Sequence, residues 1–131
     1  MSKPEYHGDL TTASGLHRAV WSLCRELYPQ YTLLENHPLK VNVGGRTTTL
    51  YIDIVIKELG VAIECHGSQH FHAVNHFHGG RTGFGKSVQR DSAKVAAIAE
   101  AGLNYLMVPF TEEKTLTAKK LSKRILKAIG A

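Results

Sequence analysis

Two acidic residues are predicted to lie side by side on neighbouring strands of one β-hairpin. The segments 47–56 and 61–66 are rich in β-branched residues, and the four residues between them are typical of a turn. If the turn closes directly, Asp53 faces Glu64 across the hairpin. Like charges at opposed positions are destabilising, so this pair needs a cation, a shared proton or full exposure to water.

A divalent cation would remove the repulsion, because carboxylate oxygens are the ligands that Mg²⁺ prefers. Asp is also a poor strand former at a place where Thr or Lys would serve. Exposure remains the alternative, since an antiparallel hairpin can leave one face in water. The same register predicts four further cross-strand pairs: Ile56–Val61, Ile54–Ile63, Ile52–Cys65 and Tyr51–His66. It also predicts one hairpin face that is almost wholly apolar.

Histidines gather immediately after this hairpin. Five of the chain's eight lie within thirteen residues: His66, His70, His72, His76 and His78. Histidine is the common base near neutral pH and a common transition-metal ligand. One interpretation is a zinc site of His72, His76 and His78, with His70 as a further ligand, although no cysteine supports it. The other is a solvated loop in which individual histidines have no role.

The elements that must position these residues follow from periodicity and turn signals. We expect helices at 15–28, 87–101 and 116–129, and extended segments at 31–35, 39–43, 47–56, 61–66 and 105–108. The break between the first two extended segments is placed at Pro38. This order predicts a single α/β domain, an α+β sandwich, in residues 1–131. Residues 1–12 are expected to form a loose arm, and residues 66–86 a long His/Gly-rich active-site loop.

The charge distribution points to a polyanionic partner. Residues 1–65 carry 6 basic and 7 acidic side chains, whereas residues 66–131 carry 10 basic and 4 acidic ones. Such asymmetry suits a surface that faces nucleic acid, and a well-solvated basic helix at the C-terminus is the alternative. The composition excludes intrinsic disorder, and no apolar run approaches the roughly 20 residues of a membrane helix. We therefore expect a protein of the cytoplasm, or of the host cytoplasm if a phage encodes it, with no membrane partner; its oligomeric state is not encoded in any visible pattern.

A longer pattern resembles a known family. Residues 63–71 read Ile-Glu-Cys-His-Gly-Ser-Gln-His-Phe, and Gln-Arg-Asp follows at 89–91. Together with Asp53, this resembles the PD-(D/E)XK nuclease superfamily, and within it the branch of very-short-patch mismatch repair endonucleases and related phage-type homing endonucleases. The resemblance covers about residues 14–110. It implies a restriction-endonuclease-like mixed sheet of four to five strands flanked by three helices.

The resemblance also implies an activity and the residues that carry it. The activity would be Mg²⁺-dependent hydrolysis of phosphodiester bonds that nicks or cleaves duplex DNA, with Mn²⁺ able to substitute. Asp53, Glu64 and the Cys65 backbone carbonyl would bind the metal ion. His70 would be the general base and Asp91 would orient it. The cations Arg81, Lys86 and Arg90 would contact phosphates.

Two positions depart from the family's pattern. His66 stands where this branch usually has Asp and the wider superfamily has Lys, and it would contact the scissile phosphate or take a metal position. His17 stands where the first helix usually carries Glu, which makes Glu26 an alternative accessory residue, beside Gln69 of the quoted segment. These departures motivate a second hypothesis, a catalytically impaired nuclease-fold module that binds DNA. A third hypothesis is a zinc-binding protein built on the histidine cluster.

Overall fold

The computed structural model describes residues 5–6, 15–66 and 81–130, and the side chains of residues 15–66 and 90–130. That part of the chain contains five strands and three α-helices: β1 (Glu5–Tyr6), α1 (Gly15–Leu27), β2 (Leu33–Val43), β3 (Arg46–Ile56), β4 (Val61–His66), α3 (Arg81–Glu100), β5 (Asn104–Pro109) and α4 (Ala118–Ala128). A short 3₁₀ helix, η2 (Phe110–Glu112), lies between β5 and α4. This is the α+β fold that the sequence predicts.

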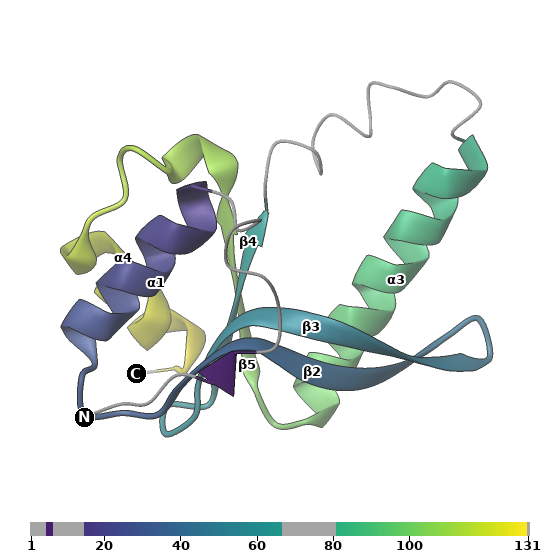
Figure 1. Cartoon of the computed structure of the whole chain (residues 1–131), viewed down its shortest axis with the longest axis horizontal. Coiled ribbons are helices and arrows are strands. Elements are labelled where there is room, and N and C mark those ends of the chain that lie inside the picture. The colour runs from purple at the N-terminus through teal and green to yellow at the C-terminus, as the bar shows by residue number, and fades with distance from the viewer. Residues whose placement is uncertain (1–4, 7–14, 67–80, 131) are drawn as a thin grey trace.

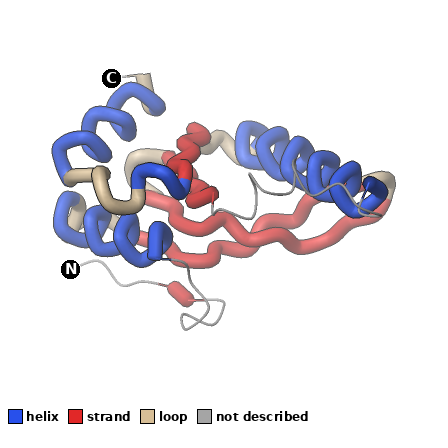
Figure 2. Tube along the Cα trace, turned by 90° about the horizontal axis from the view of Figure 1, so that it is seen from above, coloured by secondary structure: helices blue, strands red, loops and turns tan. Residues whose placement is uncertain are grey.

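The five strands form one mixed sheet in the order β1-β2-β3-β4-β5. The pairs β2–β3 and β3–β4 are antiparallel, whereas β1–β2 and β4–β5 are parallel. Helices α1 and α4 lie side by side at one end of the strands and α3 lies at the other (Figures 1 and 2). The long β2–β3 hairpin extends away from α1 and α4 (Figure 1).

Two clusters of buried side chains hold the helices against the sheet. The first joins α1 and α4 to the sheet and includes Leu16, Val20, Ile54, Ile56, Ile63, Leu121 and Ile125. The second joins α3 to the other face and consists of Leu34, Ile52, Val55, Ala62 and Ile98. Strands β3 and β4 are therefore covered on both faces over residues 54–56 and 61–63, where every side chain is buried. The acidic pair lies at the end of this sandwiched segment.

The break predicted at Pro38 does not occur, because β2 is a single strand from Leu33 to Val43. Its second neighbour, β1, pairs only with Leu34 and Glu35, so Pro38 lies where one side of β2 has no partner strand within the described residues. Proline lacks an N–H group and is tolerated in a strand at such an edge. The chain turns between β2 and β3 at Gly44-Gly45, whose φ values of 60° and 82° favour glycine.

Two other boundaries differ from the prediction. Parts of the loop expected at 66–86 belong to regular elements instead, because His66 ends β4 and α3 already begins at Arg81; residues 67–80 lie outside the described residues. Gly83 and Gly85 suggested a loop, but each lowers helix propensity by only about 1 kcal/mol and does not forbid a helix. The arm expected at 1–12 is not wholly loose, since residues 5–6 add a short parallel strand to β2. No helix in the described parts of the chain is long and apolar enough to cross a membrane.

Candidate active site

The β3–β4 ladder stops at the acidic pair. The predicted register is confirmed where Ile54 pairs with Ile63 and Ile56 with Val61. Beyond Ile54 the regular ladder ends, and the carboxylates replace it: Asp53 N–H donates to Glu64 Oε2 at 3.1 Å, and Cys65 N–H donates to Asp53 Oδ2 at 2.7 Å. Each acid thus accepts a hydrogen bond from the backbone of the opposite strand. The two carboxylates lie together as predicted, within one reciprocal hydrogen-bonded arrangement.

The predicted pairs Ile52–Cys65 and Tyr51–His66 are not among the ladder pairs, since the ladder has already ended. Tyr51 instead pairs with Pro38 of β2. The single apolar hairpin face predicted from this register is also wrong, because Ile52 joins the cluster that packs against α3 whereas Ile54 joins the one that packs against α1.

A distortion in β2 lies beside this change of face in β3. Asn36 has a left-handed backbone with φ of 51°, and the β2–β3 ladder passes from Glu35–Ile54 to His37–Ile52 without pairing Asn36 to Asp53. Asparagine tolerates this conformation better than most residues. Asp53 therefore lies where both neighbouring ladders are interrupted. Its N–H is free of the ladder and is available to Glu64.

Helix α3 supplies a cation to the pair. Lys94 Nζ forms an ion pair with Glu64 Oε1, and both side chains are largely buried, at 18% and 6% exposure. Lys94 follows Asp91 by three residues and precedes the buried Ile98 by four, so the three lie on one face of the helix. Lys94 is not among the site residues predicted from the sequence. The spacing to Ile98 was the available signal, because Ile98 fixes which face of the helix meets the sheet.

Lys94 only partly balances the negative charge of Asp53 and Glu64. Burial and, to a lesser extent, the neighbouring Asp53 charge raise the pKa of Glu64 to about 7, against the opposing effect of Lys94. A carboxyl group whose pKa rises this far is one that would gain from more positive charge nearby. The electrostatics of the acidic pair therefore suit a bound cation.

This pKa predicts how stability depends on pH in the metal-free protein. The folded-state pKa of Glu64 lies above the ordinary value of 4.5, so the folded protein holds a proton that the unfolded chain has lost between pH 4.5 and about 7. The associated stabilisation is complete below the lower value and is lost as pH rises through the upper one. We expect the free energy of unfolding in urea with EDTA to decrease across this window, and the Glu64→Gln variant to show a shallower decrease. Equal slopes for both proteins would contradict the assignment.

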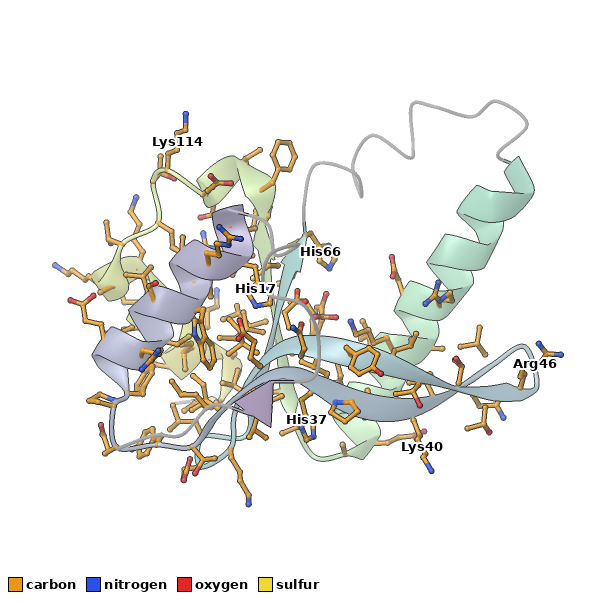
Figure 3. All side chains as sticks on the ribbon, in the orientation of Figure 1. His17, His37, Lys40, Arg46, His66 and Lys114 are labelled. Carbon is orange, nitrogen blue, oxygen red and sulfur yellow. The ribbon has the colours of Figure 1, made fainter. Side chains whose placement is uncertain are left out.

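His17 reaches the same site from α1. Its Nε2 lies 2.8 Å from Glu35 Oε2, and its Nδ1 lies 3.8 Å from Asp53 Oδ1. Figure 3 shows His17 directed from α1 toward the sheet. Both members of the His17–Glu35 pair are buried, Glu35 at 2% exposure. The sequence placed His17 near the site but missed Glu35, which lies opposite Ile54 and beside the distortion at Asn36.

Glu26, the alternative to His17, is exposed near the C-terminal end of α1. Nine residues separate it from His17, which is about 13 Å along a helix axis. The structure therefore places His17 beside Asp53 and leaves Glu26 at a distance from it.

Replacing His17 with Ala should lower the free energy of unfolding, because Glu35 would remain buried without its partner. In His17→Ala the carboxylate loses its imidazole partner inside the fold, and breaking a buried pair in this way costs about 3–5 kcal/mol. Replacing both members, His17→Leu with Glu35→Leu, removes the unpaired charge and should recover part of this loss. Urea unfolding at pH 7 measures both effects. A single variant as stable as the double variant would show that the pair is not coupled.

Tyr105 of β5 connects two of the predicted residues to the acidic pair. Its hydroxyl lies 3.3 Å from His66 Nε2. Burial and, to a lesser extent, the charges of Glu64, Asp91 and Asp53 raise the pKa of Tyr105 to about 12. Asp91 and His66 therefore both lie near Tyr105. Tyr105 is also close enough to Asp53 and Glu64 for their charges to raise its pKa. Tyr105 was missed as a site residue, since the sequence identified only a short buried strand there.

The structure brings together Asp53, Glu64, Cys65, His66 and His17, and it places Asp91 at an exposed position of α3 from which its charge acts on Tyr105. Gln69, His70, His72, His76 and His78 lie outside the described residues. For Arg81 and Lys86 only the backbone is described, as part of α3, and Arg90 is exposed on the same helix. The thiol of Cys65 has a pKa raised by burial and by the two neighbouring carboxylates, so it is not a nucleophile.

Whether these residues could bind a metal ion depends on the donor atoms that they bring together. Among the side chains described for residues 15–66 and 90–130, no three His, Cys, Asp or Glu groups are already arranged to hold a metal ion. Two side-chain carboxylates and the adjoining backbone of Cys65 do converge, and Mg²⁺ is commonly bound through only one or two carboxylates, with water and substrate phosphate as the other ligands. The residues present therefore fit a Mg²⁺ ion.

Comparison with known proteins adds one partial relative. A stretch of 63 residues is 41% identical to "Uncharacterized protein 094L" of Frog virus 3 (isolate Goorha), and it makes up 47% of this chain and 41% of the viral protein. The chain thus matches less than half of that relative's length, and the printed name of the relative states no activity. No family model matches the chain, and no solved structure matches it.

Proposed function

We propose that this protein is a Mg²⁺-dependent DNA endonuclease that hydrolyses phosphodiester bonds of duplex DNA. The observation that carries the proposal is the reciprocal arrangement of Asp53 and Glu64, an acidic pair of which Glu64 is buried and Asp53 partly exposed. The quoted resemblance to the PD-(D/E)XK superfamily and the basic C-terminal half support it. The proposed compartment is the cytoplasm, where such a substrate and reduced cysteines are compatible.

Asp53, Glu64 and the Cys65 carbonyl would hold the Mg²⁺ ion. When bound, the ion would polarise the phosphate and lower the pKa of an attacking water. Asp53 is fixed for this role by the Cys65 N–H, which leaves its second oxygen facing His17. Lys94 favours the ionised form of Glu64, because its ammonium group opposes the effects of burial and of the Asp53 charge.

The remaining residues would handle the proton and the phosphate. His70 is proposed to accept the proton of the attacking water, with Asp91 orienting its imidazole ring. His66, held near the site by Tyr105, would donate a hydrogen bond to the scissile phosphate. Arg81, Lys86 and Arg90 would contact flanking phosphates, which position DNA without reading its sequence.

A supercoiled-plasmid assay tests the proposal. Purified protein is incubated with Mg²⁺, Mn²⁺, Ca²⁺ or EDTA, and conversion to nicked or linear DNA is followed over time. We expect conversion with Mg²⁺ and Mn²⁺ and none with EDTA. Equal conversion with EDTA, or equal residual activity in Asp53→Ala, His70→Ala and the wild type, would refute it.

One observation favours a second candidate, a DNA-binding module that has lost catalysis. Both oxygens of Glu64 already have protein partners, Lys94 and the Asp53 N–H, so a metal ion would have to displace or share one of them. This candidate predicts salt-dependent DNA binding without cleavage under any divalent cation. The same plasmid assay, combined with a binding measurement, separates the two.

The zinc hypothesis stays a prediction about His72, His76 and His78, which lie outside the described residues. Elemental analysis of protein purified without chelator tests it directly. Stoichiometric zinc supports a site in this segment, and its absence dismisses the hypothesis.

A further inference from the structure

One face of the β2–β3 hairpin is left uncovered by the rest of the described chain. Alternate residues of the two strands share this surface, here called the outer hairpin face: Pro38, Lys40, Asn42, Thr47, Thr49 and Tyr51. They pair directly across the hairpin, as Pro38–Tyr51, Lys40–Thr49 and Asn42–Thr47. All six are exposed, Tyr51 at 46%.

The opposite face of the same hairpin is apolar and packed. Val41, Leu50 and Ile52 are buried there, and Ile52 belongs to the cluster that includes Ile98 of α3. Figure 1 shows α3 lying against the hairpin. The hairpin is therefore held rigidly from one side only. Its outer face is therefore a rigid two-stranded ribbon and not a flexible loop.

The outer hairpin face begins at the candidate active site. Tyr51 precedes Asp53 by two residues on β3, and from Tyr51 to Thr47 the strand runs about 13 Å outward. Helix α1 contacts Asp53 through His17 and covers only the part of the sheet that lies beyond Asp53, away from the outer hairpin face. A ligand bound at Asp53 would thus meet the hairpin as a continuous extension of its surface.

The charge of the hairpin identifies its partner. Residues 36–51 contain no Asp or Glu, whereas they contain Lys40 and Arg46. Figure 3 labels both, with Arg46 at the tip of the hairpin and Lys40 on β2. Neither has an ion-pair partner among the described side chains, and both are exposed. The other exposed groups are hydroxyl, amide and phenol groups, which are donors that proteins use on phosphate and sugar.

We propose that the outer hairpin face, with Arg46 at its tip, binds the backbone of duplex DNA next to the acidic pair. A two-stranded ribbon fits the width of a DNA groove. Lys40 lies on the outer hairpin face, and Arg46 is exposed at the tip of the hairpin. Lys40 and Arg46 each neutralise one phosphate, and Thr47, Thr49 and Tyr51 donate hydrogen bonds along the same strand. This surface extends the proposed endonuclease function, because it gives the substrate a track that ends at Asp53.

The test is binding of a 20-base-pair duplex, measured by fluorescence anisotropy with EDTA present and at several salt concentrations. The variant is Lys40→Gln with Arg46→Gln. The matched control is Lys119→Gln with Lys123→Gln, which removes the same charge from exposed positions of α4. We expect the hairpin variant to bind roughly tenfold more weakly and its dependence of log Kd on log salt to be shallower by about two. The control should lose much less of either.

Equal losses in the hairpin and α4 variants would overturn the inference, because binding would then follow net charge alone. An unchanged affinity, or a variant that changes only self-association measured by analytical ultracentrifugation, would also overturn it. Failure of the proposed function looks different: a wild type that binds the duplex through the hairpin but cleaves nothing supports this surface and refutes the nuclease. A wild type that cleaves, with a hairpin variant that binds normally, refutes only the surface.

Discussion

Replacing Asp53 with Asn is expected to lower Mg²⁺-dependent cleavage of duplex DNA by more than about a hundredfold. Even residues that only support metal ligands cost 10–100-fold when they are changed, and Asp53 is proposed as a ligand itself. The substitution is nearly isosteric, and one amide oxygen can still accept the Cys65 N–H. The loss should therefore come from removed charge and not from unfolding. Initial rates of plasmid nicking, with thermal unfolding of the same samples, measure it.

The matched control is Glu100→Gln, which removes one carboxylate from an exposed position at the end of α3. It should cleave at the wild-type rate. If Asp53→Asn also cleaves at that rate while remaining folded, the acidic pair is not the catalytic centre.

Replacing Lys94 with Met is expected to have the second largest effect and to change the pH profile. Lys94 lowers the pKa of Glu64 against burial and the charge of Asp53, which together raise it to about 7. Without the ammonium group the pKa of Glu64 rises further, so more of the carboxyl is protonated at neutral pH. We expect roughly tenfold slower cleavage at pH 7, with the activity rise displaced upward by about one pH unit or more.

Lys94→Arg is the appropriate control, since it keeps a positive charge within reach of Glu64. It should retain a pH profile close to that of the wild type, even if geometry lowers the rate. A Lys94→Met variant with the wild-type midpoint and a uniformly lower rate would show that Lys94 has only a structural role.

The acidic pair was predictable because local signals fixed it. A four-residue turn and a run of β-branched residues determined the β3–β4 register, and Ile54–Ile63 and Ile56–Val61 form as the sequence indicates. The register also brought Asp53 and Glu64 to the same place. What it could not indicate is that the ladder ends there, beside the left-handed backbone of Asn36 in another strand.

Glu35 and Lys94 were missed for a related reason. Each meets the site through tertiary packing: Glu35 through His17 of α1, and Lys94 through the face of α3 that Ile98 anchors. Neither contact follows from spacing within one element. A buried glutamate in a strand such as β2 reads in sequence as an exposed polar position, because carboxylates are rarely buried without a partner.

The path of β2 shows how context overrides a local rule. Proline usually interrupts strands, so Pro38 predicts a break between two extended segments. Its position on the unpaired side of β2 nevertheless lets the strand continue. That continuity produces the long hairpin whose outer face we propose as a DNA-binding surface. The prediction of two short segments would have removed this feature.

The most direct test of the acidic pair is a crystal of the protein grown or soaked with Mn²⁺, examined by anomalous diffraction. We predict an anomalous peak in contact with the carboxylates of both Asp53 and Glu64. This peak should disappear in Asp53→Asn. A well-ordered site with no peak at these carboxylates, or a peak held only by histidines, would contradict the proposal that this pair is a metal-dependent centre for phosphodiester cleavage.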